Sequence, residues 1–343
     1  MPKHIAVLPC DGAGKEVVPE AIKVLRAAGA DFEYEEIDVN ADAYLRTGAA
    51  ISNDVWNQLQ KADSILFGAV GDPRVPDPNY LAGVLLRLRF GLDLYVNLRP
   101  ARLYDDRLSP LRQEQKRRVD LLIVRENTEG AYVGMGGRFK KGTKDEVATQ
   151  EDVNTFGGVT RIIEHAFELA RREVVMVDKS NAMTFAGGLW QERWKAVAAE
   201  HPHVKTRHLF VDAAAMQLVK DPSQFEVIVT GNLFGDILSD LTAELIGGMG
   251  IAPSANINPI TGRGLFEPVH GTAPDIAGRG IVNPIGAILS AAMMVRHLGD
   301  PKMADAIEGA VESAIRAREC TRDIGGDMST SQAGDAVVKR LKD

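Results

Sequence analysis

The sequence is poor in cysteine and aromatic residues, and it has no long run of basic or apolar residues. Its two cysteines, Cys10 and Cys320, lie near opposite ends of the chain, which excludes a disulfide framework and a cysteine-based metal motif. The longest basic run is Lys116–Arg118 and the net charge is −7, which argues against nucleic acid or an anionic membrane as a partner. Apolar runs stay below the roughly 18 residues that span a bilayer, and the N-terminus shows a strand pattern rather than a signal segment. We expect a cytoplasmic protein.

Short β-rich runs alternate with amphipathic helical stretches along the 343 residues, which is enough chain for two domains of ordinary size. The alternation predicts an α/β fold with largely parallel strands that are covered by helices. The strand-like runs are residues 5–8, 32–39, 64–68, 94–98, 119–124, 174–177 and 225–230. The C-terminal third is mostly helical and must cover a sheet formed earlier, so we expect one domain to be discontinuous.

The segment Tyr132–Gln150 does not fit a compact domain. It has no convincing core periodicity, and it carries four glycines and four Lys/Arg residues. A connection of this length is usually functional or pairs with something outside its own domain. We favour an intermolecular arm, and a mobile surface loop is the alternative.

Asp236 and Asp240 lie four residues apart in a stretch whose apolar residues recur at helical spacing, so both carboxylates point from one helix face. Mg²⁺ or Mn²⁺ would remove the repulsion between them, because these cations favour carboxylate oxygens. The strand-like run 225–230 precedes this helix, and open α/β sheets bind ligands beyond the carboxyl ends of their strands. The pattern leads to the hypothesis of a metal site, while a solvated acidic face is the simpler interpretation.

Basic residues form a second constellation. Arg89, Arg99 and Arg125 each lie at the end of an apolar element, where a charged head can reach a cleft. Arginine suits bidentate recognition of carboxylates. Each alone is typical of a surface ion pair, but three beside two metal-type carboxylates predict a di-carboxylate substrate.

Candidate acid–base groups and a ligand loop complete the pattern. Lys179 ends a strand-like run and Tyr132 follows a glycine-containing turn, although spacing alone would not select either residue. Residues 266–278 are dense in Gly, Pro, Thr and Asp, as in a loop that wraps a ligand with backbone amides. Residues 11–16 lack the third glycine of G-x-G-x-x-G, so a Rossmann fingerprint is not supported.

Together these motifs resemble the β-decarboxylating dehydrogenase family, which includes isopropylmalate, isocitrate, homoisocitrate and D-malate/tartrate dehydrogenases. The resemblance covers about residues 3–340, and it is carried by LLRLR with NLRP, VRENTEGAY, VDKSNAM, VDAAAM, TGNLFGDILSD and FEPVHGTAPDIAG. The chain departs from the family at its opening, where Cys10–Glu16 replaces the usual GDGIGPE. This departure leaves the role of Asp11 open.

The resemblance implies a fold other than the Rossmann fold, with two α/β domains around a mixed sheet and an active-site cleft between them. Residues 1–95 and 248–343 would form a discontinuous cofactor-binding domain. Residues 96–247 would form the substrate and dimerisation domain, including an arm at 131–150. The family also implies a homodimer whose active sites are shared between subunits.

The resemblance further implies oxidation at C2 of a 2-hydroxy di-acid, followed by loss of the β-carboxylate as CO₂. Asp236 and Asp240 would hold Mg²⁺ or Mn²⁺ together with Asp212 of the partner subunit. Lys179 of the partner subunit would be the base for the hydroxyl proton, and Tyr132 would be the acid that protonates the enol. The residues expected to bind substrate are Arg89, Arg99, Arg125, Leu85, Leu86, Asn181 and Ala182.

The expected cofactor is NAD. Asp275 lies where family members that use NAD carry an acidic residue for the adenosine ribose, and a carboxylate there repels the 2′-phosphate of NADP. The residues expected to bind the cofactor are Glu267, His270, Gly271, Thr272, Ala273, Pro274, Asp275, Ile276 and Asn283.

Leucines near the first arginine favour an apolar group on the substrate. Leu85 and Leu86 would face the substrate's γ-group, and burying the third carboxylate of isocitrate against them would be costly. The sequence therefore favours 3-isopropylmalate, and D-malate/tartrate or homoisocitrate are the alternatives. Ala182 stands where a larger apolar residue is usual, which would widen the pocket. A non-catalytic homologue would require a lost metal ligand, Tyr132 or Lys179, and all are present.

Overall fold

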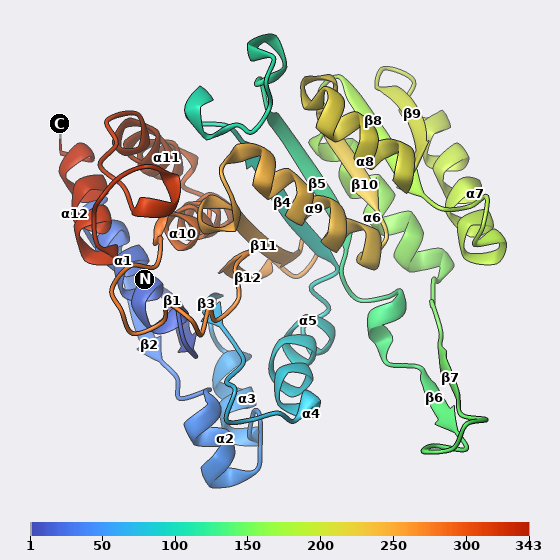
Figure 1. The fold of residues 1–343 in the computed structure, drawn as a ribbon, viewed down its shortest axis with the longest axis horizontal. Coiled ribbons are helices and arrows are strands. Elements are labelled where there is room, and N and C mark those ends of the chain that lie inside the picture. Colours follow the sequence, from blue (N-terminus) through green and yellow to red (C-terminus); the bar gives the residue numbers. More distant parts are fainter. Residues whose placement is uncertain (1, 343) are drawn as a thin grey trace.

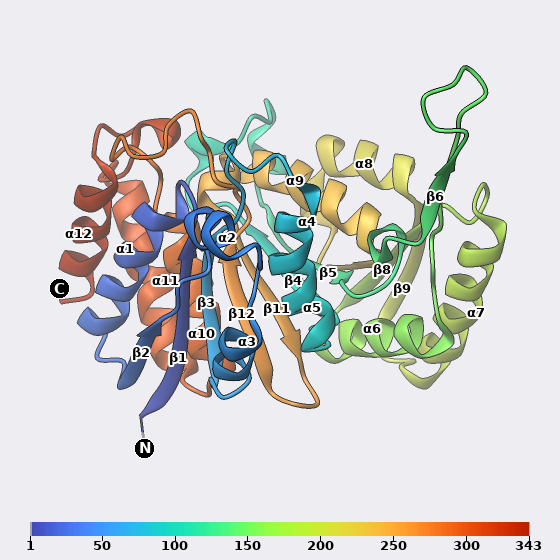
Figure 2. The ribbon, with the colours of Figure 1, turned by 90° about the horizontal axis from the view of Figure 1, so that it is seen from below.

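A computed structural model describes residues 2–342 and shows a ten-stranded mixed sheet with helices on both faces (Figures 1 and 2). In order across the sheet the strands are β2 (Phe32–Glu36), β1 (Lys3–Cys10), β3 (Ser64–Ala69), β12 (Arg263–Pro268), β11 (Pro253–Asn258), β4 (Val96–Arg102), β5 (Asp120–Glu126), β10 (Val227–Thr230), β8 (Glu173–Asp178) and β9 (Lys205–Phe210). The two outer groups of strands pair in parallel, whereas the β12–β11, β11–β4 and β4–β5 pairs in the middle are antiparallel. The predicted α/β fold with a mixed sheet is confirmed.

Strands from distant parts of the chain meet at the β11–β4 pair. All strands on one side of it come from residues 3–69 and 253–268, and all strands on the other side come from residues 96–230. This arrangement is compatible with the predicted two-domain division, which stays a prediction because one continuous sheet runs through both halves.

Helices cover the sheet on both faces. The helices are α1 (Gly14–Ala27), α2 (Ala41–Thr47), α3 (Asn53–Leu59), α4 (Pro78–Leu81), α5 (Arg87–Gly91), α6 (Phe156–Leu169), α7 (Thr184–Glu200), α8 (Val211–Lys220), α9 (Asn232–Ile246), α10 (Ile285–His297), α11 (Pro301–Arg316) and α12 (Thr330–Arg340). A π-helical turn at Ala82–Leu86 joins α4 to α5. Helices α1, α10, α11 and α12 pack together at one end of the molecule (Figure 1). Of the C-terminal helices, α10 contacts the strands β3, β11 and β12, and α11 and α12 pack against α10 and α1, respectively.

Local sequence explains several helix starts. The side chain of Thr155 accepts a hydrogen bond from the Gly158 N–H and begins α6, and Ser329 with Gln332 forms a capping box before α12. Each such cap accepts a hydrogen bond from a backbone N–H of the first turn, which has no partner within the helix. The cap stabilises the folded protein by about 1 kcal/mol. Helix α6 therefore begins at Phe156, directly after the Thr155 cap.

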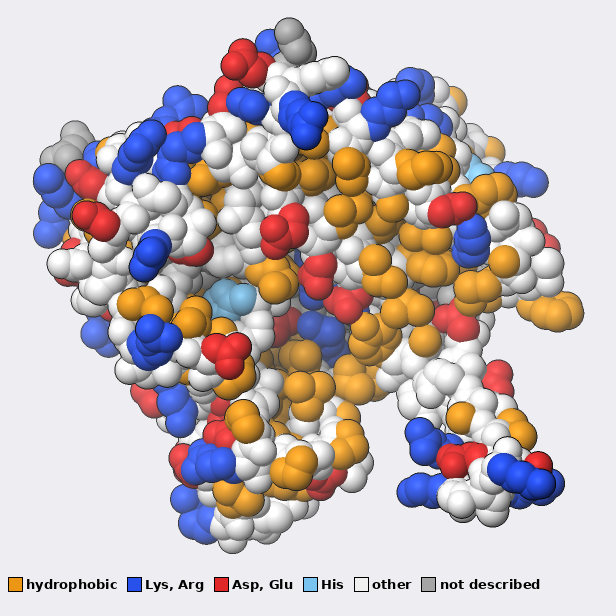
Figure 3. Space-filling view, in the orientation of Figure 1, with side chains coloured by type: hydrophobic (Ala, Val, Ile, Leu, Met, Phe, Trp, Pro, Cys, Tyr) orange, Lys and Arg blue, Asp and Glu red, His pale blue; other side chains and the backbone are white. Residues whose placement is uncertain are grey.

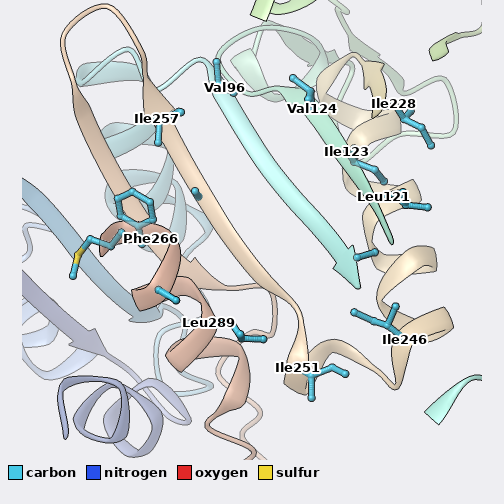
Figure 4. Close-up of a cluster of buried hydrophobic side chains, with 14 of the residues drawn as sticks. Val96, Leu121, Ile123, Val124, Ile228, Ile246, Ile251, Ile257, Phe266 and Leu289 are labelled. Atoms are coloured by element: carbon cyan, nitrogen blue, oxygen red, sulfur yellow. The ribbon is translucent and has the colours of Figure 1, made fainter. Parts of the chain in front are cut away.

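Two hydrophobic clusters hold the layers together. Along β1, Ile5 and Val7 belong to the larger cluster and Ala6 and Leu8 to the smaller one, as alternation on a doubly covered strand requires. Figure 4 shows part of the larger cluster, where side chains of the middle strands meet those of α9 and α10.

The segment expected to be an arm forms a two-stranded antiparallel ribbon of β6 (Gly136–Phe139) and β7 (Val147–Gln150). It projects from the body of the molecule (Figure 2), and all residues of both strands are exposed. An isolated two-stranded ribbon is marginally stable in water, and two large apolar side chains of this ribbon, Phe139 and Val147, are exposed.

Candidate active site

Three buried arginines lie at the bottom of a hollow of about 230 Å³ that residues of both sheet halves line. Figure 3 shows acidic and basic side chains deep within this face of the molecule, bordered by apolar ones. The lining residues are Phe67, Gly68, Ala69, Val70, Leu81, Leu85, Arg89, Arg99, Arg125, Tyr132, Asp236, Glu267, Pro268, Val269, His270 and Gly271.

Each arginine has carboxylate or polar partners. Nη2 of Arg89 donates to Oε1 of Glu267 at 2.8 Å. Nη1 of Arg99 donates to Oγ of Ser239 at 2.7 Å and lies 3.4 Å from Oδ1 of Asp240. These contacts compensate for the removal of the guanidinium groups from water.

Arg125 is the most deeply buried of the three. Its Nη1 lies 2.5 Å from Oδ1 of Asp236, and its Nε and Nη2 both donate to Oδ1 of Asn232. A Cβ atom at Gly235 would lie 2.5 Å from Cγ of Arg125, so helix α9 needs glycine there to admit the arginine. Burial and the positive charges of Arg99 and Arg89 lower the pKa of Arg125 to about 9.

The predicted carboxylate pair lies on one face of α9, as its spacing requires. Burial alone would raise the pKa of Asp236, but the nearby Arg125 and Arg99 hold it below its usual value. The pKa of Asp240 is raised, chiefly by burial. Tyr132 belongs to the same cluster, because its hydroxyl donates to Oδ2 of Asp236 at 2.8 Å.

The predicted partner-subunit residues lie elsewhere on this chain. Lys179 follows β8, and its Nζ donates to Oδ1 of Asp212 at 2.7 Å. Asn181 and Ala182 are exposed beside it, and none of these four residues lines the hollow. Among residues 2–342 no three His, Cys, Asp or Glu side chains form a cluster that could hold a metal.

Of the two leucines predicted to contact substrate, only Leu85 lines the hollow. Leu81, four residues before Leu85, lines the hollow and Leu86 does not. Residues four apart share a helix face and adjacent residues do not, so the spacing of Leu81 and Leu85 in the sequence could have indicated this pair.

The loop expected to bind a cofactor packs on the β1–α1 turn. The Ala13 N–H donates to the Thr272 carbonyl at 2.8 Å, and a Cβ at Gly12 would lie 2.3 Å from that same oxygen. Residues 263–268 at the start of this loop are strand β12, which the sequence did not suggest. Ala273, Pro274, Asp275 and Ile276 follow, with Asp275 exposed.

Three side chains of the predicted cofactor set, those of Glu267, His270 and Asn283, have hydrogen-bond partners within the chain. Oε1 of Glu267 accepts from Arg89, and Nδ2 of Asn283 donates to Oδ2 of Asp323 at 2.9 Å. Nδ1 of His270 contacts the Gly271 carbonyl at 2.9 Å, and since a carbonyl only accepts, Nδ1 carries the proton. Nε2 of His270 is buried without a partner within residues 2–342, so it is left as an acceptor.

Asp11, whose role the sequence left open, joins three loops. Its carboxylate accepts from the N–H groups of Ala41 and Gly71, both at 2.9 Å, and from the Tyr80 hydroxyl at 2.6 Å. The residue is buried, and it fixes the loops beyond β1 and β3 on which the hollow is built.

Comparison with known proteins agrees with this geometry. The family model described as isocitrate/isopropylmalate dehydrogenase matches residues 4–337. The chain belongs to this family. It is 47% identical to a 3-isopropylmalate dehydrogenase of Corynebacterium glutamicum, over 98% of this chain and 99% of that one. It is also 47% identical to a protein of the same name from Leifsonia xyli subsp. xyli, over 98% and 97% of the two chains.

The fold is shared with solved structures. The crystal structure of isocitrate dehydrogenase from Methylococcus capsulatus superposes with a TM-score of 0.92 at 36% identity, covering 99% of this chain and all of that one. The predicted family is therefore confirmed. No helix within residues 2–342 is long and apolar enough to cross a membrane.

Proposed function

We propose that this protein oxidises and decarboxylates 3-isopropylmalate to 2-oxo-4-methylpentanoate and CO₂ in leucine biosynthesis, with NAD and Mg²⁺ or Mn²⁺. The observation that carries the proposal is the hollow itself, which joins three buried guanidinium groups to an apolar wall of Val70, Leu81 and Leu85. The names of the relatives at 47% identity support the same activity.

The charges in the hollow favour a di-anionic substrate bound with a divalent cation. Arg89, Arg99 and Arg125 already face Glu267, Asp236 and Asp240. A di-acid of charge −2 and a cation of charge +2 would together preserve this balance. Burial and the positive charges of Arg99 and Arg89 lower the pKa of Arg125, and a substrate carboxylate beside this guanidinium would oppose that effect.

The apolar wall selects the third substituent of the substrate. An isopropyl group would bury its methyl groups against Leu81 and Leu85, with a gain of about 0.8 kcal/mol per carbon. The third carboxylate of isocitrate would lose its hydration there without a partner. D-malate or tartrate, which lack the isopropyl group, remain the alternative substrates, and homoisocitrate is disfavoured for the same reason as isocitrate.

The carboxylates fit a divalent metal once a second subunit is considered. Asp236 and Asp240 supply hard oxygen ligands on one face of α9, and Asp212 of the partner subunit would supply the third. When bound, the cation polarises the C2 oxygen of the substrate and stabilises enolate charge.

The loop 268–276 fits a dinucleotide. The unpartnered Nε2 of His270 is an acceptor for a ligand N–H, and the exposed carboxylate of Asp275 favours ribose hydroxyls over a 2′-phosphate. When bound, NAD accepts the hydride from C2.

Tyr132 of one subunit and Lys179 of the partner subunit would transfer the two protons of the reaction. Burial and the hydrogen bond to Asp236 raise the pKa of Tyr132 above its usual value of 10.0, which keeps its hydroxyl protonated and able to donate to the enol carbon. The amine of Lys179 would accept the proton of the C2 hydroxyl.

A homodimer would complete the site, and the surface supports one. Met216 and Val219 on α8 and Leu233 and Ile237 on α9 are exposed. Figure 3 shows apolar side chains gathered over these two helices. Such a patch on the surface marks an interaction site, and the ribbon β6–β7 would clasp the partner.

The test is NADH formation with 3-isopropylmalate, D-malate, L-tartrate, isocitrate and homoisocitrate, each with Mn²⁺ and with EDTA. We expect a metal-dependent kcat/KM that is highest for 3-isopropylmalate by about tenfold or more. A higher value for D-malate would show that the leucine wall is not a specificity pocket. Absence of turnover with every substrate would contradict the proposal.

A further inference from the structure

A chain of buried amides runs through the middle strands beneath Arg89. Oδ1 of Asn256 on β11 accepts hydrogen bonds from Nδ2 of Asn97 on β4 and Nδ2 of Asn127, each at 3.0 Å. On its other side, Nδ2 of Asn256 donates to Oε1 of Glu267 at 2.8 Å. That same Oε1 accepts from Nη2 of Arg89 at 2.8 Å. The three asparagines are buried, and the network crosses the β11–β4 pair where the sheet halves meet.

The carboxylate of Glu267 sets the direction of the whole network. An ionised carboxylate only accepts, so Asn256 must present its NH₂ group to Glu267 and its carbonyl oxygen to the other side. Asn97 and Asn127 must then both present NH₂ groups to that oxygen. Donors therefore converge on Oε1 of Glu267 from Asn256 and from Arg89.

Arg89 depends on this carboxylate more than the other two arginines depend on theirs. Within residues 2–342, the Arg89 side chain makes a single hydrogen bond, to Glu267. Nε of Arg89 is buried without a partner among these residues. Arg125, in contrast, is held by both Asn232 and Asp236, and Arg99 by Ser239 and Asp240. A guanidinium with a single anchor takes its orientation from that anchor.

We propose that Asn256 is a positioning residue for substrate binding: it holds Glu267 so that Glu267 orients the guanidinium of Arg89 toward the substrate carboxylate. Asn256 does not line the hollow, and among its hydrogen-bond partners Glu267 is the one that does. The positioning role depends on the proposed function only because 3-isopropylmalate is the substrate used to test it.

Asn256→Asp is the decisive variant. It keeps the acceptor for Asn97 and Asn127 but sets a second carboxylate against Glu267, with no donor between them. The double variant Asn256→Asp/Glu267→Gln restores the pair. The amide introduced at position 267 can donate to the carboxylate introduced at position 256, and its oxygen can still accept from Arg89.

A matched control lies two residues along the same strand. Nδ2 of Asn258 donates to the carbonyl and side chain of Asp93, near the β11–β12 turn. Asn258→Asp makes the same chemical change next to another carboxylate, but away from Glu267 and Arg89. It reports how far a misplaced charge on β11 perturbs the enzyme through general loss of stability.

The readout is the KM for 3-isopropylmalate compared with kcat, together with the melting temperature. We expect Asn256→Asp to raise KM at least tenfold, Asn258→Asp to leave KM within about twofold, and the double variant to recover at least a third of the lost kcat/KM. A structural role alone would lower the melting temperature and the active fraction but leave KM unchanged.

Three results would overturn the proposal. They are an unchanged KM in Asn256→Asp, an equal rise in Asn258→Asp, or a double variant no better than the single one. If Asn256→Asp does not fold, Asn256→Ser is judged by the same KM comparison with Asn258→Ser. If the wild type shows no turnover, the proposed function fails, and calorimetric affinities for 3-isopropylmalate and D-malate in the same variants decide the positioning role.

Discussion

The hydroxyl of Tyr132 donates a hydrogen bond to Oδ2 of Asp236 at 2.8 Å, which ties the proposed proton donor to a proposed metal ligand. Oδ1 of the same carboxylate is ion-paired with Arg125. A single aspartate therefore connects the groups proposed to bind substrate, hold the metal and deliver the proton.

Tyr132→Phe should lower kcat by about 10²–10⁴ while KM changes little, because the hydroxyl is the proposed general acid and does not bind a substrate carboxylate. Steady-state kinetics with 3-isopropylmalate checks this. Tyr95→Phe is the control, since Tyr95 is a buried tyrosine that does not line the hollow. A kcat of Tyr132→Phe within threefold of wild type would remove Tyr132 from the mechanism.

Leu85→Ala should reduce kcat/KM for 3-isopropylmalate about tenfold or more and leave that for D-malate nearly unchanged, since only the first substrate places methyl groups against this wall. Leu86→Ala provides the matched control, because Leu86 is not part of the lining. Equal losses in the two variants would contradict the assignment of Leu85 to this wall.

Mixing two inactive variants should restore activity if the active site is shared. Lys179→Met and Asp236→Asn each disable every site of their own homodimer, but a mixed dimer combines an intact Asp236 with Lys179 of the partner subunit. Random exchange of subunits would restore about a quarter of wild-type activity. Co-expression with two affinity tags and an activity assay of the mixed dimer measures this. A mixed dimer with no activity would show that each subunit works alone.

Glu20 on α1 should make stability depend on pH. Burial raises the pKa of its carboxyl, the contact with Lys23 opposes this rise, and the negative charge of Asp335 adds to it. Because the folded pKa lies above the usual 4.5, the stabilising contribution of this group is complete below about pH 4.5 and is lost as the pH rises through the folded value.

The variant Glu20→Gln has no carboxyl to ionise, so it does not lose this stability as the pH rises. The difference in melting temperature between the variant and wild type should therefore shift in favour of the variant, on the order of 1 °C, between pH 4.5 and pH 7. Thermal unfolding at a series of pH values measures the difference. Glu36→Gln, which removes an exposed carboxylate at the end of β2, controls for the change in net charge. A difference that stays constant with pH would contradict the assignment.

Features that depend on local spacing could be predicted from the amino-acid sequence. The interval between Asp236 and Asp240 placed both on one face of α9, and the alternating strands and helices indicated the α/β class. The six motifs identified the family, because their order and identity depend on the chemistry of the site rather than on the surrounding packing.

The pairing of residues far apart in the sequence becomes visible in the folded structure. The antiparallel strands β11 and β12 and the meeting of Asn256, Glu267 and Arg89 join residues up to 178 positions apart. Local propensity carries no information about such partners. Burial did not follow from the pattern either, because Leu233 and Ile237 fit a core helix and yet are exposed. A helical stripe records that a surface is apolar, whereas the rest of the fold determines whether the chain itself covers it.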